Sequence, residues 1–222
     1  MLNKNYIAEA LGTFTLVFCG TAAMAINEVT NGSVTHVGIG ITWGFIVIAL
    51  IYAFGEISGA HFNPAVSIAF AVAKKFEWKE VPKYIVSQFL GAMLASFLVW
   101  YLFPESEFLG GTHTILPPEK AFLLEYLLTF FLMMVIINVS TGSKETGMMA
   151  GIAIGGVVML EAIFAGPMTN ASMNPVRSLA PAIMSLKFDN LWLYLIAPFL
   201  GAITAVFTCR IVKKDGCCNE NC

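Results

Sequence analysis

Two Asn-Pro dipeptides, Asn63-Pro64 and Asn174-Pro175, each stand between a glycine-containing polar stretch and a short apolar run. Asparagine is a favoured helix N-cap and proline is tolerated at the first helical position, so each motif predicts the start of a short helix. The side-chain amides can also donate hydrogen bonds to the oxygen of a small molecule. Arg177 follows the second motif and adds fixed guanidinium donors. We therefore expect these residues to bind small polar molecules rather than to catalyse a reaction.

The composition indicates a protein embedded in a lipid bilayer. Of the 222 residues, 58% are hydrophobic and 12% are charged, which leaves too little polar surface to cover a soluble globule of this size. The net charge is −2 and no Lys/Arg cluster interleaved with aromatic residues is present, which excludes a nucleic-acid partner. Apolar stretches with the roughly 20 residues needed to cross a bilayer predict six transmembrane helices. These stretches lie near residues 6–26, 37–56, 82–103, 121–140, 148–165 and 190–212.

The distribution of basic residues predicts the orientation. The first apolar run is not followed by a small-residue cleavage site, so we expect it to be retained as a span. If the N-terminus is cytoplasmic, nine of the twelve basic residues fall in cytoplasmic segments, as the positive-inside rule requires. These nine are Lys4, Lys74, Lys75, Lys79, Lys83, Lys144, Arg210, Lys213 and Lys214. The sequence therefore predicts a multi-pass protein of the cell membrane with both termini in the cytoplasm.

The chain is an internal duplication. Three motifs of the first half recur in the same order in the second, at offsets of 116, 111 and 110 residues. They are Glu9-x-Leu11-x-Thr13-Phe14 with Glu125-x-Leu127-x-Thr129-Phe130, Asn63-Pro64 with Asn174-Pro175, and Phe89-Leu90-Gly91-Ala92 with Phe199-Leu200-Gly201-Ala202. Each half has an odd number of spans, so the halves are inverted. We expect one domain over residues 1–222, with repeats 1–112 and 113–214, a cytoplasmic tail 215–222, and a functional site where the repeats meet near the bilayer midplane.

The duplication gives the Asn-Pro motifs a role beyond helix capping. Irregular backbone at membrane depth is tolerated when it lines a water-filled cavity, so the stretch before each motif is expected to line a pore with its carbonyl oxygens. The two helix N-termini, which carry partial positive charge, would point at the centre and repel cations. Glu9 and Glu125, at repeat-related positions, are expected to be buried acceptors for the backbone N–H groups of these stretches. The expected pore-lining carbonyls are those of Gly59, Ala60, His61, Asn170, Ala171 and Ser172.

At these residues the sequence resembles the aquaporin, or major intrinsic protein, family over nearly its whole length. The resemblance rests on the boxes Asn63-Pro64-Ala65 and Asn174-Pro175-Val176 and on the Arg177 that follows the second box. The second box departs from the family's Asn-Pro-Ala, because Val176 replaces alanine and puts the local packing and pore width in question. The resemblance implies an all-α membrane fold with six transmembrane helices and two re-entrant half-helices, assembled as a homotetramer without a cofactor.

The resemblance also implies a selectivity filter of Trp43, Ala162, Ala171 and Arg177 on the outer side. In water-selective members the position of Ala162 holds histidine, which narrows the opening. The two alanines leave space opposite the indole and the guanidinium, which suits a solute with hydroxyls on one side and carbon on the other. This set resembles the nodulin-26-like branch and its bacterial relatives. It implies a passive channel, not an enzyme, for water, glycerol-like polyols and undissociated metalloid acids, closed to protons and ions.

Three alternative functions stay open. The first is a water-selective aquaporin. The second is an ion-coupled secondary transporter, because such transporters also use inverted repeats and broken helices. The third is a structural membrane protein with an occluded pore.

Two further groups of residues, Glu161 and the cysteines of the C-terminal tail, could take part in binding. Glu161 directly precedes Ala162, so on a helix it points about 100° away from the filter and is expected to contact a neighbouring helix or loop. In the tail, Cys217, Cys218 and Cys222 are soft ligands that could capture arsenite or a soft metal. The favoured interpretation is a disordered cytoplasmic end whose thiols are reduced. No Cys/His spacing predicts a metal site elsewhere.

Overall fold

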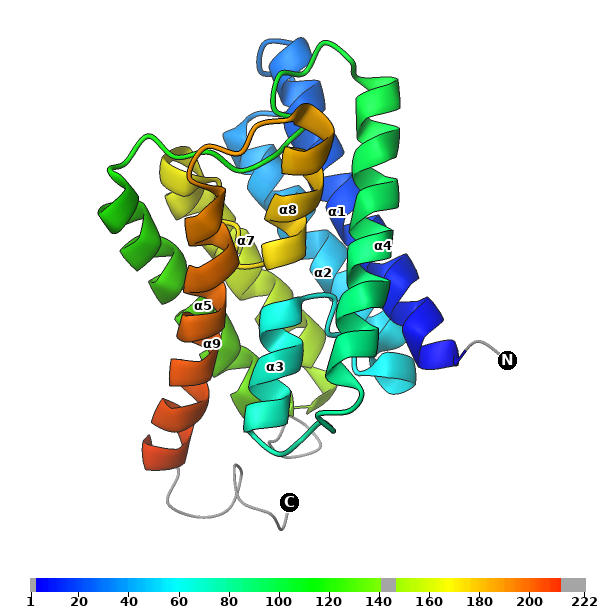
Figure 1. Cartoon of the computed structure of the whole chain (residues 1–222), viewed down its shortest axis with the longest axis vertical. Helices are drawn as coiled ribbons and strands as arrows, with labels where there is room; N and C mark the ends of the chain where they lie inside the picture. The colour runs from blue at the N-terminus through cyan, green and yellow to red at the C-terminus, as the bar shows by residue number, and fades with distance from the viewer. Residues whose placement is uncertain (1–2, 141–146, 213–222) are drawn as a thin grey trace.

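The structure is a computed structural model, and it describes residues 3–140 and 147–212. Within these ranges it consists of six long helices and two short ones (Figure 1). The long helices are α1 (Lys4–Val29), α2 (His36–Ser58), α4 (Val81–Leu102), α5 (Pro118–Ser140), α7 (Ala150–Thr169) and α9 (Leu191–Val212), and the short ones are α3 (Pro64–Val72) and α8 (Pro175–Ser185). All six long helices are long and apolar enough to cross a membrane. The predicted fold class, with six spans and two half-helices, is confirmed.

The end of the fifth span differs from the prediction. The apolar pattern suggested an end near residue 165, because Gly166-Pro167 interrupts it, but α7 continues to Thr169 with Pro167 inside it. Proline lacks one N–H and clashes with the carbonyl four residues back, yet bundle packing and local adjustment of the helix let membrane helices tolerate it. The irregular stretch before the second motif is therefore shorter than the sequence suggests.

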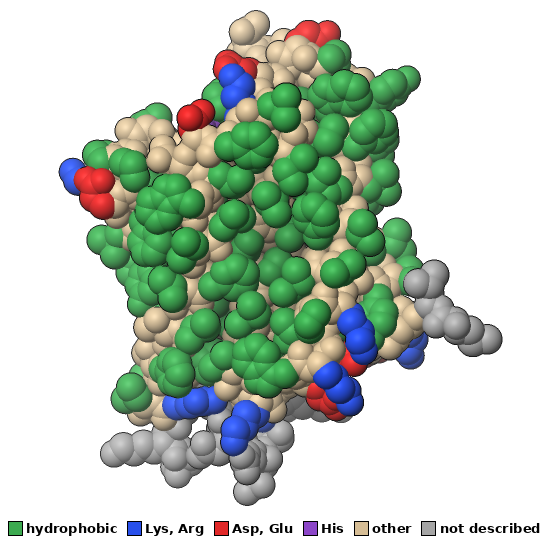
Figure 2. All heavy atoms as spheres, viewed as in Figure 1, with side chains coloured by type: hydrophobic (Ala, Val, Ile, Leu, Met, Phe, Trp, Pro, Cys, Tyr) green, Lys and Arg blue, Asp and Glu red, His purple; other side chains and the backbone are tan. Residues whose placement is uncertain are grey.

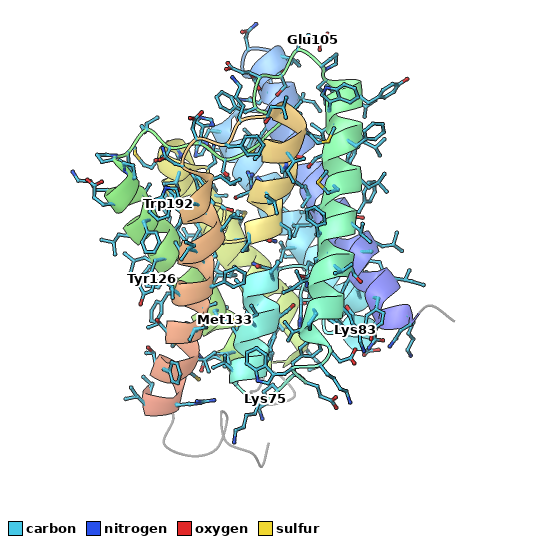
Figure 3. All side chains as sticks on the ribbon, viewed as in Figure 1. Lys75, Lys83, Glu105, Tyr126, Met133 and Trp192 are labelled. Atoms are coloured by element: carbon cyan, nitrogen blue, oxygen red, sulfur yellow. The ribbon has the colours of Figure 1, made fainter. Side chains whose placement is uncertain are left out.

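The two halves pack in the same way. Helix α1 packs on α4 in the first half and α5 packs on α9 in the second, while α2 and α7 join the halves. A Cβ added at Gly91 of α4 would lie 2.2 Å from the carbonyl oxygen of Ala10, and one added at Gly201 of α9 would lie 2.2 Å from that of Tyr126, which Figure 3 labels on α5. Glycine is thus required at both crossings, because only a residue without Cβ lets the backbones approach so closely.

The half-helices lie one above the other between the long helices, with α8 above α3 in Figure 1. Helix α1 begins and α9 ends at the same, lower end of the bundle in that view. Figure 2 shows a broad band of hydrophobic side chains on the visible face and a concentration of Lys and Arg side chains at the lower end. An apolar band between charged ends is the surface expected of a protein that spans a bilayer.

Candidate functional site

Each half-helix begins at its Asn-Pro motif. Asn63 is the N-cap of α3, and its Oδ1 accepts a hydrogen bond of 2.9 Å from the backbone N–H of Ala65. Asn174 caps α8 in the same way, with its Oδ1 accepting from Val176 N at 3.2 Å and Arg177 N at 3.5 Å. The proline that follows each cap takes the first helical position, where its missing N–H would have had no partner. The side-chain oxygens are therefore committed to capping.

The side-chain nitrogens of the same asparagines connect the two halves. Asn63 Nδ2 donates to the carbonyl oxygen of Met173 at 2.8 Å, and Asn174 Nδ2 donates to that of Phe62 at 2.9 Å. The two hydrogen bonds are related by the repeat, because each runs from one motif to the residue that precedes the other. An amide nitrogen carries two N–H groups, so each asparagine retains a second donor.

Glu9 holds the re-entrant stretch of the first half. This fully buried carboxylate accepts hydrogen bonds from the backbone N–H groups of His61 at 2.9 Å and Phe62 at 2.8 Å. The side chains of Ser58 at 2.7 Å and Gln88 at 2.8 Å complete its partners. Two of the four contacts are to backbone N–H groups of successive residues, so Glu9 fixes the backbone at this point.

Glu125 has the corresponding position in the second half. Its oxygens accept from Ser172 N at 3.0 and 3.1 Å and from Met173 N at 3.0 Å. The side chain is fully buried, and the hydroxyl of Thr169 also approaches it.

The carboxylates determine which way the nearby carbonyls face. In a trans peptide the C=O of one residue points opposite to the N–H of the next. Because the N–H groups of His61 and Phe62 point at Glu9, the carbonyls of Ala60 and His61 point away from it. The same geometry around Glu125 turns the carbonyls of Ala171 and Ser172 away from that carboxylate. Each re-entrant stretch therefore presents two successive acceptors to the opposite side.

The backbone of these stretches is strained at repeat-related positions. The φ angles of Ala60 and Phe62 are 51° and 49°, and those of Ala171 and Met173 are 42° and 55°. Non-glycine residues in this region cost of order 1–3 kcal/mol each and persist only where the surroundings enforce them. The carboxylates and the Asn-to-carbonyl hydrogen bonds supply that enforcement.

A single cavity of about 920 Å³ brings most of the sequence-predicted residues together. Its lining includes the four filter candidates, both motif asparagines and five of the six residues whose carbonyls were expected to face a pore. These lining residues are Trp43, Ala162, Ala171, Arg177, Asn63, Asn174, Gly59, Ala60, His61 and Ser172. Asn170, the sixth of these residues, does not belong to the lining, and its side-chain Oδ1 accepts a hydrogen bond of 2.9 Å from the backbone N–H of His113.

Arg177 is almost fully buried, with 2% of its surface exposed, and its guanidinium is held on three sides. Nη1 donates to the carbonyl oxygen of Gly110 at 3.0 Å, and Nη2 donates to the sulfur of Met24 at 3.2 Å. The Cζ atom lies 4.8 Å from the centre of the Trp43 ring, in a cation–π arrangement. Among the described residues no carboxylate lies within ion-pair distance of Arg177.

Val176 packs away from the cavity. It belongs to a cluster of buried residues with Val17 of α1 and with Ala92 and Ala95 of α4. Neither Val176 nor Ala65, the third residue of the other box, is part of the cavity lining. The extra bulk of valine is thus taken up between helices.

Glu161 is buried on α7, with 1% of its surface exposed, and it does not line the cavity. Neither oxygen of its carboxyl group has a hydrogen-bond partner among the described residues. Three supporting residues were not anticipated from the sequence, namely Met24, Gln88 and Gly110. The tail cysteines Cys217, Cys218 and Cys222 lie outside the described residues.

Comparisons with known proteins agree with this geometry. The family model described as Major intrinsic protein matches residues 1–209. Nodulin-26 from Glycine max is 44% identical over 211 residues, which cover 95% of this chain and 78% of that protein. Aquaporin NIP1-1 from Oryza sativa subsp. japonica is 41% identical over 217 residues, covering 95% and 74%. The X-ray structure of the aquaglyceroporin from Plasmodium falciparum matches with a TM-score of 0.87 at 28% identity, covering 95% of this chain and 97% of that one.

Proposed function

Since the chain belongs to the major intrinsic protein family and is a channel for water and small solutes, we propose that its solutes include glycerol-like polyols and undissociated metalloid acids. The observation that carries this proposal is that Ala162 and Ala171 line the same cavity as Trp43 and Arg177, and that the Cζ atom of Arg177 lies 4.8 Å from the centre of the Trp43 ring. An alanine side chain ends at Cβ, so Ala162 and Ala171 leave room for a solute with a carbon backbone.

The proposed path uses hydrogen-bonding groups in sequence along the cavity. The guanidinium of Arg177 binds hydroxyls at the outer constriction, and the carbonyls of the re-entrant stretches accept hydrogen bonds further in. At the midplane, the second N–H of Asn63 and that of Asn174 donate to one oxygen of the solute. A molecule that exchanges its water shell for these groups crosses without a large desolvation cost.

Exclusion of ions follows from fixed positive charge. The N-termini of α3 and α8 begin at the two asparagines, and a helix N-terminus carries about half an elementary charge. The charge of Arg177 adds to this field, because no described carboxylate pairs with it. A cation or proton therefore meets repulsion both at the filter and at the midplane, whereas a neutral solute does not.

Orientation and assembly are part of the proposal. The Lys and Arg side chains at the end where α1 begins support a cytoplasmic location of both termini in the cell membrane. The family resemblance supports a homotetramer with one pore in each subunit. Each subunit then consists of two inverted repeats, residues 1–112 and 113–214.

Stopped-flow measurements on proteoliposomes test this function. Water, glycerol, boric acid and arsenious acid are each applied as a gradient, and all four are expected to cross faster than in protein-free vesicles, with glycerol flux rising linearly with concentration. Passage of water alone would instead identify a water-selective channel. Dependence on a proton or sodium gradient would identify a coupled transporter, and no flux at all would identify an occluded protein.

A further inference from the structure

The support of the filter by helix α1 is not explained by the Asn-Pro motifs. A Cβ added at Gly20 would lie 2.3 Å from the ring of Trp43, so the indole lies flat against this helix. Gly110, whose carbonyl binds Arg177, has a φ of +67°, and a Cβ there would lie 2.4 Å from the carbonyl oxygen of Thr21. Met24 follows one turn after Gly20 and contacts the guanidinium itself. One segment of α1 thus contacts two filter residues, Trp43 and Arg177, and also Gly110, whose carbonyl oxygen binds Arg177.

Met24 differs from the other two contacts because it acts through its side chain. Its sulfur lies 3.2 Å from Nη2 of Arg177, while the rest of the side chain is partly buried against the main hydrophobic core. A thioether is a weak, uncharged acceptor, so it orients the guanidinium without cancelling its charge. The nearest acid on α1, Glu28, is not available, because its oxygens accept from Ser106 Oγ at 2.6 Å and Glu107 N at 3.0 Å.

We propose that Met24 is a positioning residue of the filter: its sulfur holds Nη2 of Arg177 against α1, so that the remaining N–H groups face the hydroxyls of an uncharged polyol. This proposal rests on the proposed function, since it names the group that orients the solute-binding arginine. With Gly110 and Met24 occupying one N–H on each terminal nitrogen, the guanidinium keeps a fixed plane beside Trp43. A solute then meets donors in one arrangement only.

The first test compares Met24→Leu with Met24→Gln in proteoliposomes. Leucine keeps the apolar volume but removes the acceptor, so Nη2 is freed to bind the solute or swing across the opening. Glycerol permeability is expected to fall about fivefold, the effect of one lost hydrogen bond, while water permeability changes less than about twofold. Glutamine restores an acceptor and is expected to recover most of the glycerol permeability. A purely packing role predicts equal loss for both solutes and no recovery, and an unchanged glycerol-to-water ratio in Met24→Leu overturns the proposal.

A double-mutant cycle with Arg177→Val tests the contact without any solute. Thermal unfolding in detergent is measured for wild type, Met24→Leu, Arg177→Val and the double variant. Coupling is expected, so Met24→Leu lowers the midpoint in the wild type but not in the Arg177→Val background. Additive effects overturn the proposal even if glycerol transport is observed. If the wild type carries no glycerol, the proposed function fails, and this cycle still decides the role of Met24.

Discussion

In both halves of the channel a buried glutamate binds the backbone N–H groups of the re-entrant stretch, but the two glutamates differ in the number of hydrogen-bond donors around them. Glu9 receives two backbone and two side-chain donors, whereas Glu125 receives two backbone donors and the approach of Thr169. At the offset of 110 that relates Phe89 to Phe199, the counterpart of Gln88 is Pro198, which has no side-chain donor. The second half has thus lost one hydrogen bond that the first half keeps.

The second half also carries the groups that have no counterpart in the first. At the offset of 111 that relates the motifs, Arg177 corresponds to Val66, and Glu161, which has no hydrogen-bond partner within the described ranges, corresponds to Leu50. Buried polar groups without partners are costly, and natural proteins retain them mainly where function requires. The comparison therefore shows that the carboxyl group holding the re-entrant stretch has more hydrogen-bond donors in the first half, whereas the buried charged residues Glu161 and Arg177 lie in the second half only.

The largest expected effect comes from the carboxylates. In Glu9→Gln an amide NH₂ replaces one acceptor oxygen, so a donor faces another donor in a buried site. We expect the free energy of unfolding to fall by about 4 kcal/mol in Glu9→Gln and by about 2–3 kcal/mol in Glu125→Gln, which has fewer partners to lose. Denaturant titration in detergent measures both. A greater loss in Glu125→Gln would reverse the comparison.

A histidine is expected to reduce glycerol permeability at Ala162 in the second half but not at the repeat-related position in the first half. Ala162→His narrows the opening opposite Arg177 and is expected to reduce glycerol permeability about thirtyfold, or roughly 2 kcal/mol of barrier, while sparing water. The matched control is Ile51→His at the repeat-related position, which lines the cavity but has Val66 in place of an arginine counterpart. Stopped-flow glycerol uptake should be near normal in that control, and unchanged uptake in Ala162→His would show that the filter is assigned wrongly.

Glu161 offers a way to make the halves more alike. Glu161→Leu installs the residue type of its counterpart Leu50 and removes a buried carboxyl group for which the described part of the chain offers no hydrogen-bond partner. The free energy of unfolding is therefore expected to rise by about 1–2 kcal/mol. Denaturant titration of this variant beside Glu161→Gln, which keeps the polarity, measures the difference. If Glu161→Leu is less stable than wild type, the carboxyl group has a partner that the described residues do not include.

The change that is expected to leave solute transport unaltered is at Val176, where the second box departs from the family's Asn-Pro-Ala. Val176→Ala restores the family's Asn-Pro-Ala and removes two carbon atoms from the cluster with Val17, at a cost of about 1.6 kcal/mol in the free energy of unfolding. In the first half, Ala65 lies in a core with the larger Met133, labelled in Figure 3, whose counterpart is Val17. The second box thus combines the larger Val176 with the smaller Val17 of α1, and the first box combines the smaller Ala65 with the larger Met133 of α5. Solute preference should not change, and a shift in the glycerol-to-water ratio would contradict this packing.

Much of the fold was predictable because hydrophobic length and internal repetition are local signals. The six spans and the starts of both half-helices are confirmed, and the largest difference in a span boundary is the end of α7, which continues past Pro167 to Thr169. The functional roles assigned to Arg177 and its filter partners stay predictions, although the structure brings them into one cavity.

The contacts that support the filter could not be predicted from the sequence. Met24 and Arg177 are 153 residues apart, and a methionine in an apolar helix looks like any other hydrophobic residue until the chain is folded. The sequence gives a stronger signal for Gln88, because an amide side chain within a predicted transmembrane span needs a hydrogen-bond partner. The sequence does not indicate which residue that partner is.

The paired hydrogen bonds between each motif asparagine and the opposite carbonyl also constrain how the protein is made. They join residues 110 and 112 positions apart, so the first motif cannot make its bond to Met173 until most of the chain exists. At translation rates of about 5–20 residues per second, roughly 5–20 s pass between the synthesis of Asn63 and that of Met173. Until then the N-terminus of α3 lacks its contact with the second half. During that interval Glu9 holds the stretch before α3 using only residues of the first half. The fuller set of donors around Glu9 thus belongs to the repeat that is synthesised first and must persist alone.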